Sequence, residues 1–131
     1  MPELLPSPEV QPQEAITRHC LSVSSHMRRD LGKGRYKLFL PRPYLELSVA
    51  RSSGMTHQQI QSLGIEHVNS GVKGHATVAA AVVFDHCTGL SFVANGDPYP
   101  QHADIVGWAL VEEQARSYAG RMADASTLVE Y

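Results

Sequence analysis

Four basic side chains surround two glycines in one short polar segment of this chain. They are Arg28, Arg29, Lys33 and Arg35, beside Gly32 and Gly34. Glycines let main-chain N–H groups approach an anion, while nearby cations neutralise its charge. The spacing differs from the GxxxxGK[ST] pattern of a phosphate-binding P-loop. We therefore expect an anion-binding surface on this loop, and the alternative is a solvated connection between two strands.

Histidine is the second residue type that points to chemistry, because the chain contains seven copies. Four of them stand at the ends of expected elements: His26, His75, His86 and His102. No pair shows the HExxH or CxxC spacing that specifies zinc, so we expect no metal and no other cofactor. Imidazole also serves as a general acid or base near neutral pH. His26, His75 and His102 are therefore candidate catalytic residues.

The stretch His75-Ala76-Thr77-Val78 resembles half of the motif of the 2H phosphoesterases. The resemblance implies two such histidines, one acting as general acid and one as general base. The nearest second copy is His102-Ala103-Asp104-Ile105, in which aspartate replaces the serine or threonine of the motif. The two copies also lie closer together in sequence than is usual in that family.

Arg51 stands at the end of an expected strand and is followed by Ser52, Ser53 and Gly54. Such a position suits an arginine that holds an anionic ligand, which makes Arg51 a further site candidate. The alternative, which we favour, is a salt bridge to an acidic residue in the C-terminal part of the chain.

Cys20 and Cys87 each follow a histidine directly. Neighbouring side chains in a strand point to opposite faces, so a catalytic Cys/His dyad is not supported. Because no secretory signal is apparent, we expect buried free thiols rather than a disulfide, and a cytoplasmic protein.

The elements that must position these residues fit in one small domain. A chain of 131 residues has room for one core. Residues 1–13 contain four of the eight prolines and no apolar periodicity, so we expect a disordered tail that does not join the core. Residues 14–131 are expected to form the domain. No apolar run approaches the roughly 18 residues of a membrane span, so no membrane partner is expected.

Hydrophobic patterns predict five strands and two helices. Strands are expected over 15–23, 36–40, 44–51, 75–84 and 90–94, with the last two forming a hairpin. Thr56 and Gln59 form a capping box for a short helix that Gly64 is expected to close. A second helix follows Trp108, with an apolar stripe formed by Val111, Ala115, Tyr118, Ala119 and Met122. This order predicts an α+β domain, a small mostly antiparallel sheet covered by the C-terminal amphipathic helix and one short helix.

The net charge of −2 conceals a separation of charge along the chain. Residues 15–51 carry eight basic and two acidic side chains, whereas residues 52–131 carry three basic and eight acidic ones. The first folded third is therefore basic. An acidic protein or a nucleic acid is the kind of partner that such a surface attracts.

Four patterns in the chain together resemble a group of short uncharacterised bacterial proteins. They are Ser25-His26, Phe39-Leu40-Pro41, Leu47-Ser48-Val49-Ala50-Arg51 and the stretch from His102 to Trp108 that reads His-Ala-x-Ile-x-Gly-Trp. The resemblance covers roughly residues 16–123 and implies a compact bacterial domain without indicating a reaction. It increases the interest of His26, Arg51 and His102.

Two functions fit these observations. The first is a non-enzymatic binding domain of a bacterial accessory or conflict system, which uses the basic loop toward an anionic partner. The second is a small histidine-dependent enzyme that acts on a phosphate-bearing substrate. Convergence of His26, His75 or His102 with Arg51 on one pocket would favour the enzyme, whereas scattered positions or single packing in the core would contradict it.

Overall fold

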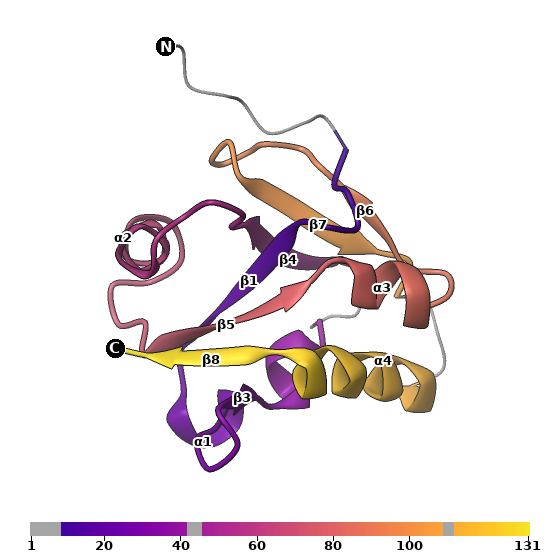
Figure 1. The fold of residues 1–131 in the computed structure, drawn as a ribbon, viewed down its shortest axis with the longest axis horizontal. Helices are drawn as coiled ribbons and strands as arrows, with labels where there is room; N and C mark the ends of the chain where they lie inside the picture. Colours follow the sequence, from indigo (N-terminus) through magenta and orange to yellow (C-terminus); the bar gives the residue numbers. More distant parts are fainter. Residues whose placement is uncertain (1–8, 42–45, 109–111) are drawn as a thin grey trace.

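The computed structural model of this chain describes residues 9–41, 46–108 and 112–131 (Figure 1). The strands are β1 (Ala15–Cys20), β2 (Met27–Arg28), β3 (Lys33–Gly34), β4 (Glu46–Arg51), β5 (Gly74–Ala79), β6 (Ser91–Val93), β7 (His102–Val106) and β8 (Thr127–Glu130). The helices are α1 (Val23–His26), the 3₁₀ helix η1 (Tyr36–Phe39), α2 (His57–His67), α3 (Ala81–His86) and α4 (Glu112–Ala125). Six strands form an antiparallel sheet in the order β6-β7-β4-β1-β5-β8, and β2 pairs with β3. The predicted α+β class with its C-terminal helix is confirmed.

The six-stranded sheet has one apolar face and one polar face. Residues directly opposite one another in antiparallel strands share a face, and Thr17 pairs with both Ala50 and Thr77. The polar face carries Thr17, His19, Ser48, His75, Thr77, His102 and Asp104. The opposite face carries Ile16, Cys20, Leu47, Val49, Ala76, Val78, Ala103 and Ile105, all buried in the core.

The apolar face is covered by α3, α4 and η1, which contact one another or the sheet. Figure 1 shows α3 and α4 side by side, away from α2. Ala115, Tyr118, Ala119 and Met122 of the predicted stripe are buried, while Val111 lies outside the described residues. Their spacing at i, i+3, i+4 and i+7 places them on one side of the helix, which is the side that faces the core.

Helix α2 packs against the polar face of the sheet. The Nε2 atom of His19 lies 2.8 Å from the Ile60 carbonyl oxygen, to which it donates a hydrogen bond. The predicted closure at Gly64 is wrong, because the helix continues to His67. A Cβ atom at Gly64 would overlap the His19 ring, so glycine is needed there for close packing of helix on sheet and not for a left-handed cap.

The predicted capping box of α2 is present, because the Thr56 side chain accepts from the Gln59 N–H at 3.1 Å and the Gln59 side chain accepts from the Thr56 N–H at 2.8 Å. Replacing Thr56 with alanine removes one of these bonds and is expected to lower the free energy of unfolding by about 1 kcal/mol. Urea denaturation measures this, and a Thr56→Ser variant that retains the hydroxyl should lose less.

The strand predicted over 36–40 is wrong, since Tyr36–Phe39 form the 3₁₀ helix η1. Three consecutive side chains, Leu38, Phe39 and Leu40, are all buried. A strand with one solvated face buries every second residue, whereas a short helix can turn consecutive side chains toward the core.

The strand predicted over 75–84 ends at Ala79, and residues 81–86 form α3. The predicted hairpin is also wrong, because β5 pairs with β1 and β8, whereas β6 pairs with β7. The continuous apolar run over 75–84 covers two elements. Val78 lies in β5, Val83 lies in α3, and both belong to the core.

The expected N-terminal tail, residues 1–13, falls largely outside the described residues. Its last part differs from the expectation, because Val10 is only 6% exposed and belongs to the core. The Pro12 carbonyl also accepts a hydrogen bond of 2.8 Å from the Ala81 N–H at the start of α3. An isolated apolar residue among prolines carries no periodicity that could have indicated this packing.

Candidate functional site

Strands β1 and β4 pair at only two positions before they diverge. Ile16 pairs with Arg51 and Thr17 with Ala50. Beyond Thr17, β1 remains paired with β5 as far as Cys20, while β4 remains paired with β7 as far as Glu46. A cavity of about 350 Å³ lies where the two strands separate, and we call it the Arg18 cleft.

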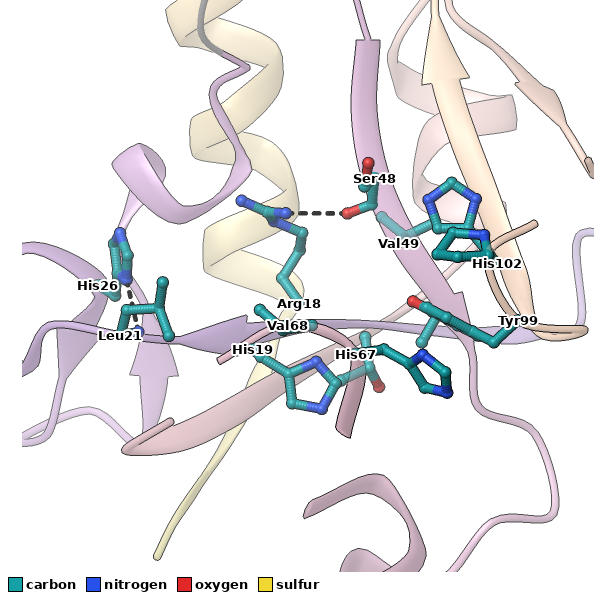
Figure 2. Close-up of a pocket in the computed structure, with 13 residues that line it drawn as sticks. Arg18, His19, Leu21, His26, Ser48, Val49, His67, Val68, Tyr99 and His102 are labelled. Carbon is teal, nitrogen blue, oxygen red and sulfur yellow. Dashed lines mark hydrogen bonds between the residues drawn. The ribbon is translucent and has the colours of Figure 1, made fainter. Parts of the chain in front are cut away.

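The lining of the Arg18 cleft is rich in nitrogen donors and contains no carboxylate among the described residues. It consists of Thr17, Arg18, His19, Leu21, His26, Ser48, Val49, Ala50, His67, Val68, Pro98, Tyr99 and His102. These residues come from β1, α1, β4, α2, β7 and the loops that adjoin them, and Figure 2 shows ten of them labelled.

Arg18 bridges the gap between the separating strands. Its Nε donates to the Leu38 carbonyl oxygen at 2.9 Å. Its Nη1 donates to the Ser48 carbonyl oxygen, also at 2.9 Å (Figure 2). Burial lowers the pKa of Arg18, but a guanidinium stays charged at neutral pH. Within the described part of the chain, Arg18 forms no ion pair and its Nη2 has no protein acceptor. Its half-buried charge therefore lacks a counter-ion from these residues.

Tyr99 forms one wall of the cleft, between two histidine rings. Its ring centroid lies 4.7 Å from that of His67 and 5.3 Å from that of His102. Burial raises the pKa of Tyr99 to about 12, so the hydroxyl remains protonated. No described residue accepts a hydrogen bond from this hydroxyl, which is thus available to a ligand.

His26 is held as a neutral donor at the end of α1. Its Nδ1 accepts a hydrogen bond of 3.0 Å from the Leu21 N–H, so the hydrogen of the neutral ring is on Nε2. Burial lowers the pKa of His26 below its usual range, and the positive charge of Arg18 lowers it by a smaller amount.

His102 belongs to a hydrogen-bonded network at the side of the cleft formed by β4 and β7. Its Nδ1 lies 2.7 Å from Asn95 Oδ1, and Asn95 Nδ2 donates to Asp104 Oδ2 at 2.8 Å. The other carboxylate oxygen of Asp104 accepts from Ser48 Oγ at 3.1 Å and lies 3.7 Å from His102 Nε2. His102 and Asp104 are 8% and 6% exposed, so little water competes with this network.

The structure therefore brings together two of the four candidate catalytic residues, His26 and His102. Three of the four patterns that carry the bacterial resemblance reach the cleft: Ser25-His26 through His26, the Leu47–Arg51 pattern through Ser48 and Val49, and the last through His102. Residues 39–41 do not line it. Arg51 and His75 do not line it either, so the convergence with Arg51 that would favour the enzyme is not found.

His75 lies on β5, buried on the polar face of the sheet with no exposed surface. Its Nδ1 is 2.5 Å from the Tyr131 hydroxyl, while its Nε2 has no hydrogen-bond partner among the described residues. Burial, and then the nearby His19 and His57, lower the pKa of His75 to about 4. The two histidines of the phosphoesterase-like pattern, His75 and His102, therefore do not share one site, because only His102 lines the Arg18 cleft.

Arg51 forms a buried ion pair, but with a different partner from the one expected. Its Nε and Nη2 donate to the two carboxylate oxygens of Glu14, both at 2.8 Å. The predicted partner in the C-terminal part of the chain is wrong, because Glu14 directly precedes β1, and β1 pairs with β4 at Ile16 and Arg51.

The four residues of the basic loop, on and around the β2–β3 hairpin, do not converge on one point. Arg29 pairs with Glu130 at 2.7 Å, and the Lys33 amine donates to the Asp124 carbonyl oxygen. Arg28 and Arg35 line a separate hollow of about 530 Å³, together with Ser24, Ser25 and Lys37. We call this the basic hollow; it remains a candidate surface for an anionic partner.

Sequence reasoning missed Arg18, His67 and Tyr99. A signal for Arg18 exists in the pattern of β1, where Ile16, Arg18 and Cys20 occupy the face that should be apolar. An arginine on an apolar face indicates that polar groups of the protein surround its guanidinium. No comparable signal marks His67 or Tyr99, which reach the cleft through the packing of α2 and of the loop before β7.

Cys20 and Cys87 are buried free thiols, as predicted. Burial raises their pKa to about 12 and about 11, so neither is a ready nucleophile at neutral pH. Among residues 9–41, 46–108 and 112–131, no three His, Cys, Asp or Glu side chains are arranged to hold a metal ion. No helix in these ranges is long and apolar enough to span a membrane.

Comparison with known proteins gives no match to any family model, curated protein or solved structure.

Proposed function

We propose that this domain binds a small phosphate-bearing anion in the Arg18 cleft. The observation that supports the proposal is the half-buried guanidinium of Arg18, which has no carboxylate partner among the residues lining a cavity of about 350 Å³. Buried charges in proteins are paired, because removing an ion from water is costly unless an opposite charge compensates it. A bound anion supplies that charge.

The arrangement of donors favours phosphate over a carboxylate. The three residues Arg18, Tyr99 and His26 come from different elements, all line the cleft, and each carries a hydrogen-bond donor. A phosphate group presents three or more acceptor oxygens in a tetrahedral arrangement, whereas a carboxylate presents two in a plane. The cavity volume falls at the lower end of the range for small-molecule sites.

Titration of the isotope-labelled protein with inorganic phosphate, followed by NMR, tests this proposal. We expect amide shifts around β1 and β4, and binding at least tenfold weaker in Arg18→Gln, because a hydrogen bond to a charged group contributes about 1.5–3 kcal/mol. Acetate as a second probe should bind more weakly than phosphate. Arg116→Gln, which removes an exposed arginine of α4, should leave binding unchanged.

The basic hollow is the competing site for the same anion. A double variant, Arg28→Gln with Arg35→Gln, removes two of its cations and leaves the Arg18 cleft intact. Loss of phosphate binding in this variant but not in Arg18→Gln would contradict the proposal and favour the loop surface predicted from the sequence.

A further inference from the structure

We propose that the Arg18 cleft hydrolyses a phosphoester, with His102 as the residue that accepts the proton of the attacking water. The inference rests on the proposed function, since the ester must first bind beside Arg18. It goes further, because binding requires only donors and charge, whereas hydrolysis requires a base. Two contacts of His102, with Asn95 and with Asp104, support this assignment.

The tautomer of His102 is fixed by its neighbour Asn95. The Asn95 amide nitrogen donates to Asp104, so its carbonyl oxygen is left to accept from His102 Nδ1 at 2.7 Å. An amide oxygen cannot donate, and Nδ1 of the neutral ring must therefore carry the hydrogen. The lone pair is on Nε2, which makes His102 a proton acceptor, in contrast to His26.

Asp104 lies beside His102 on β7. The Asp104 Oδ1 atom lies 3.7 Å from His102 Nε2, the nitrogen that gains the proton. Hydrogen bonds from Asn95 and Ser48 hold this carboxylate in place. Asn95 and Asp104 are thus positioning residues, which orient the ring and compensate the charge that develops on it.

The step balances without a cofactor. Water attacks phosphorus and loses a proton to His102 Nε2, while the bond from phosphorus to the ester oxygen breaks. The leaving oxygen takes a proton from the imidazolium, which restores neutral His102. Where solvent protonates the leaving oxygen instead, the imidazolium releases its proton to solvent. Arg18, with donors from Tyr99 and His26, faces the negative charge on the non-bridging oxygens.

The closing experiment measures hydrolysis of bis(p-nitrophenyl) phosphate, a diester, and of p-nitrophenyl phosphate, a monoester. We expect turnover of at least one of them, and a loss of kcat of about 100-fold or more in His102→Gln. Phosphate binding, measured by NMR in the same variant, should persist because Arg18 is retained. His86→Gln, which changes an exposed histidine outside the cleft, is the matched control and should be as active as the wild type.

The positioning role of Asn95 has its own readout. Asn95→Ala should lower kcat and move the acid limb of the pH–rate profile, because His102 loses the acceptor that fixes its tautomer. The other titratable or charged groups around His102 are Asp104 on its own strand, Tyr99 before it, His67 of α2 and Arg18 of β1. A merely structural role for Asn95 would lower activity without moving the limb.

The outcomes separate this inference from the proposed function. Phosphate binding without turnover of either ester overturns the inference and leaves the binding proposal standing. Undiminished turnover in His102→Gln also overturns it. Should His102→Gln fail to fold, Asn95→Ala decides, because an unchanged rate and an unmoved acid limb there contradict the assignment. Absence of phosphate binding in the wild type removes both proposals.

Discussion

Acidification from pH 7 to pH 4 is expected to lower the free energy of unfolding by about 3 kcal/mol through His75 alone. The folded protein holds the pKa of His75 at about 4, below the ordinary value of 6.5, because burial disfavours the charged ring. Between these values the unfolded chain binds more protons than the folded one. Stability from this group is therefore complete above pH 6.5 and declines as the pH falls toward 4.

His19 and His26 act in the same direction, because burial also lowers their pKa. Urea denaturation at several pH values measures the decline, and NMR titration should find His75 neutral at pH 5. The variant His75→Phe keeps a buried ring that does not titrate, so its stability should depend less on pH. His86→Gln, at an exposed position, should follow the wild type. A wild-type stability that is constant between pH 7 and pH 4 would contradict this account.

Glu14→Ala is expected to lower the free energy of unfolding by about 3 kcal/mol, because it leaves a buried cation without its carboxylate. The Arg51 side chain is 5% exposed, and Glu14 meets it with both oxygens. Hydrogen bonding from Arg51 also holds the pKa of Glu14 below its usual range, so this contribution is lost when acid protonates Glu14. Thermal or urea denaturation at pH 7 gives the difference.

A double variant distinguishes the loss of the pair from the cost of leaving the Arg51 charge without Glu14. Glu14→Leu with Arg51→Met replaces both groups with apolar side chains and should recover most of the stability. Glu112→Ala is the comparison at the surface, since its pair with Arg116 is largely exposed and worth less than about 0.5 kcal/mol. A Glu14→Ala variant as stable as Glu112→Ala would refute the assignment of Arg51 to a buried pair.

Local patterns predicted those elements whose partners lie close in sequence or whose periodicity is strong. The capping box at Thr56 and the stripe from Ala115 to Met122 depend on spacings within one helix, and both are present. Strand pairing depends on residues far apart in the chain. The apolar run of β5 does not indicate which strand pairs with β5. Strand β8 was not predicted, because Thr127–Glu130 is short and only partly buried.

Only part of the candidate site was predicted, because the site too depends on contacts between residues far apart in the chain. His26 and His102 were identified by residue type and by their place at the ends of elements, and both line the cleft. Arg18 was not: its place on the apolar face of β1 was a signal that was not used, and its bonds to Leu38 and Ser48 join residues far apart in the chain. For Arg51 the sequence left two roles open, binding of a ligand or a salt bridge. The structure shows a salt bridge, because the Glu14 carboxylate pairs with the Arg51 guanidinium.

The short pairing of β1 with β4 divides the sheet into two three-stranded halves, β6-β7-β4 and β1-β5-β8. Few main-chain hydrogen bonds join the two halves, and the Arg18 side chain adds a hydrogen bond from one half to the Ser48 carbonyl oxygen of the other. An anion bound by both Arg18 and His102 would be a second connection between the two halves. On the proposed function, occupancy of the cleft would therefore strengthen the association of the two halves of the sheet.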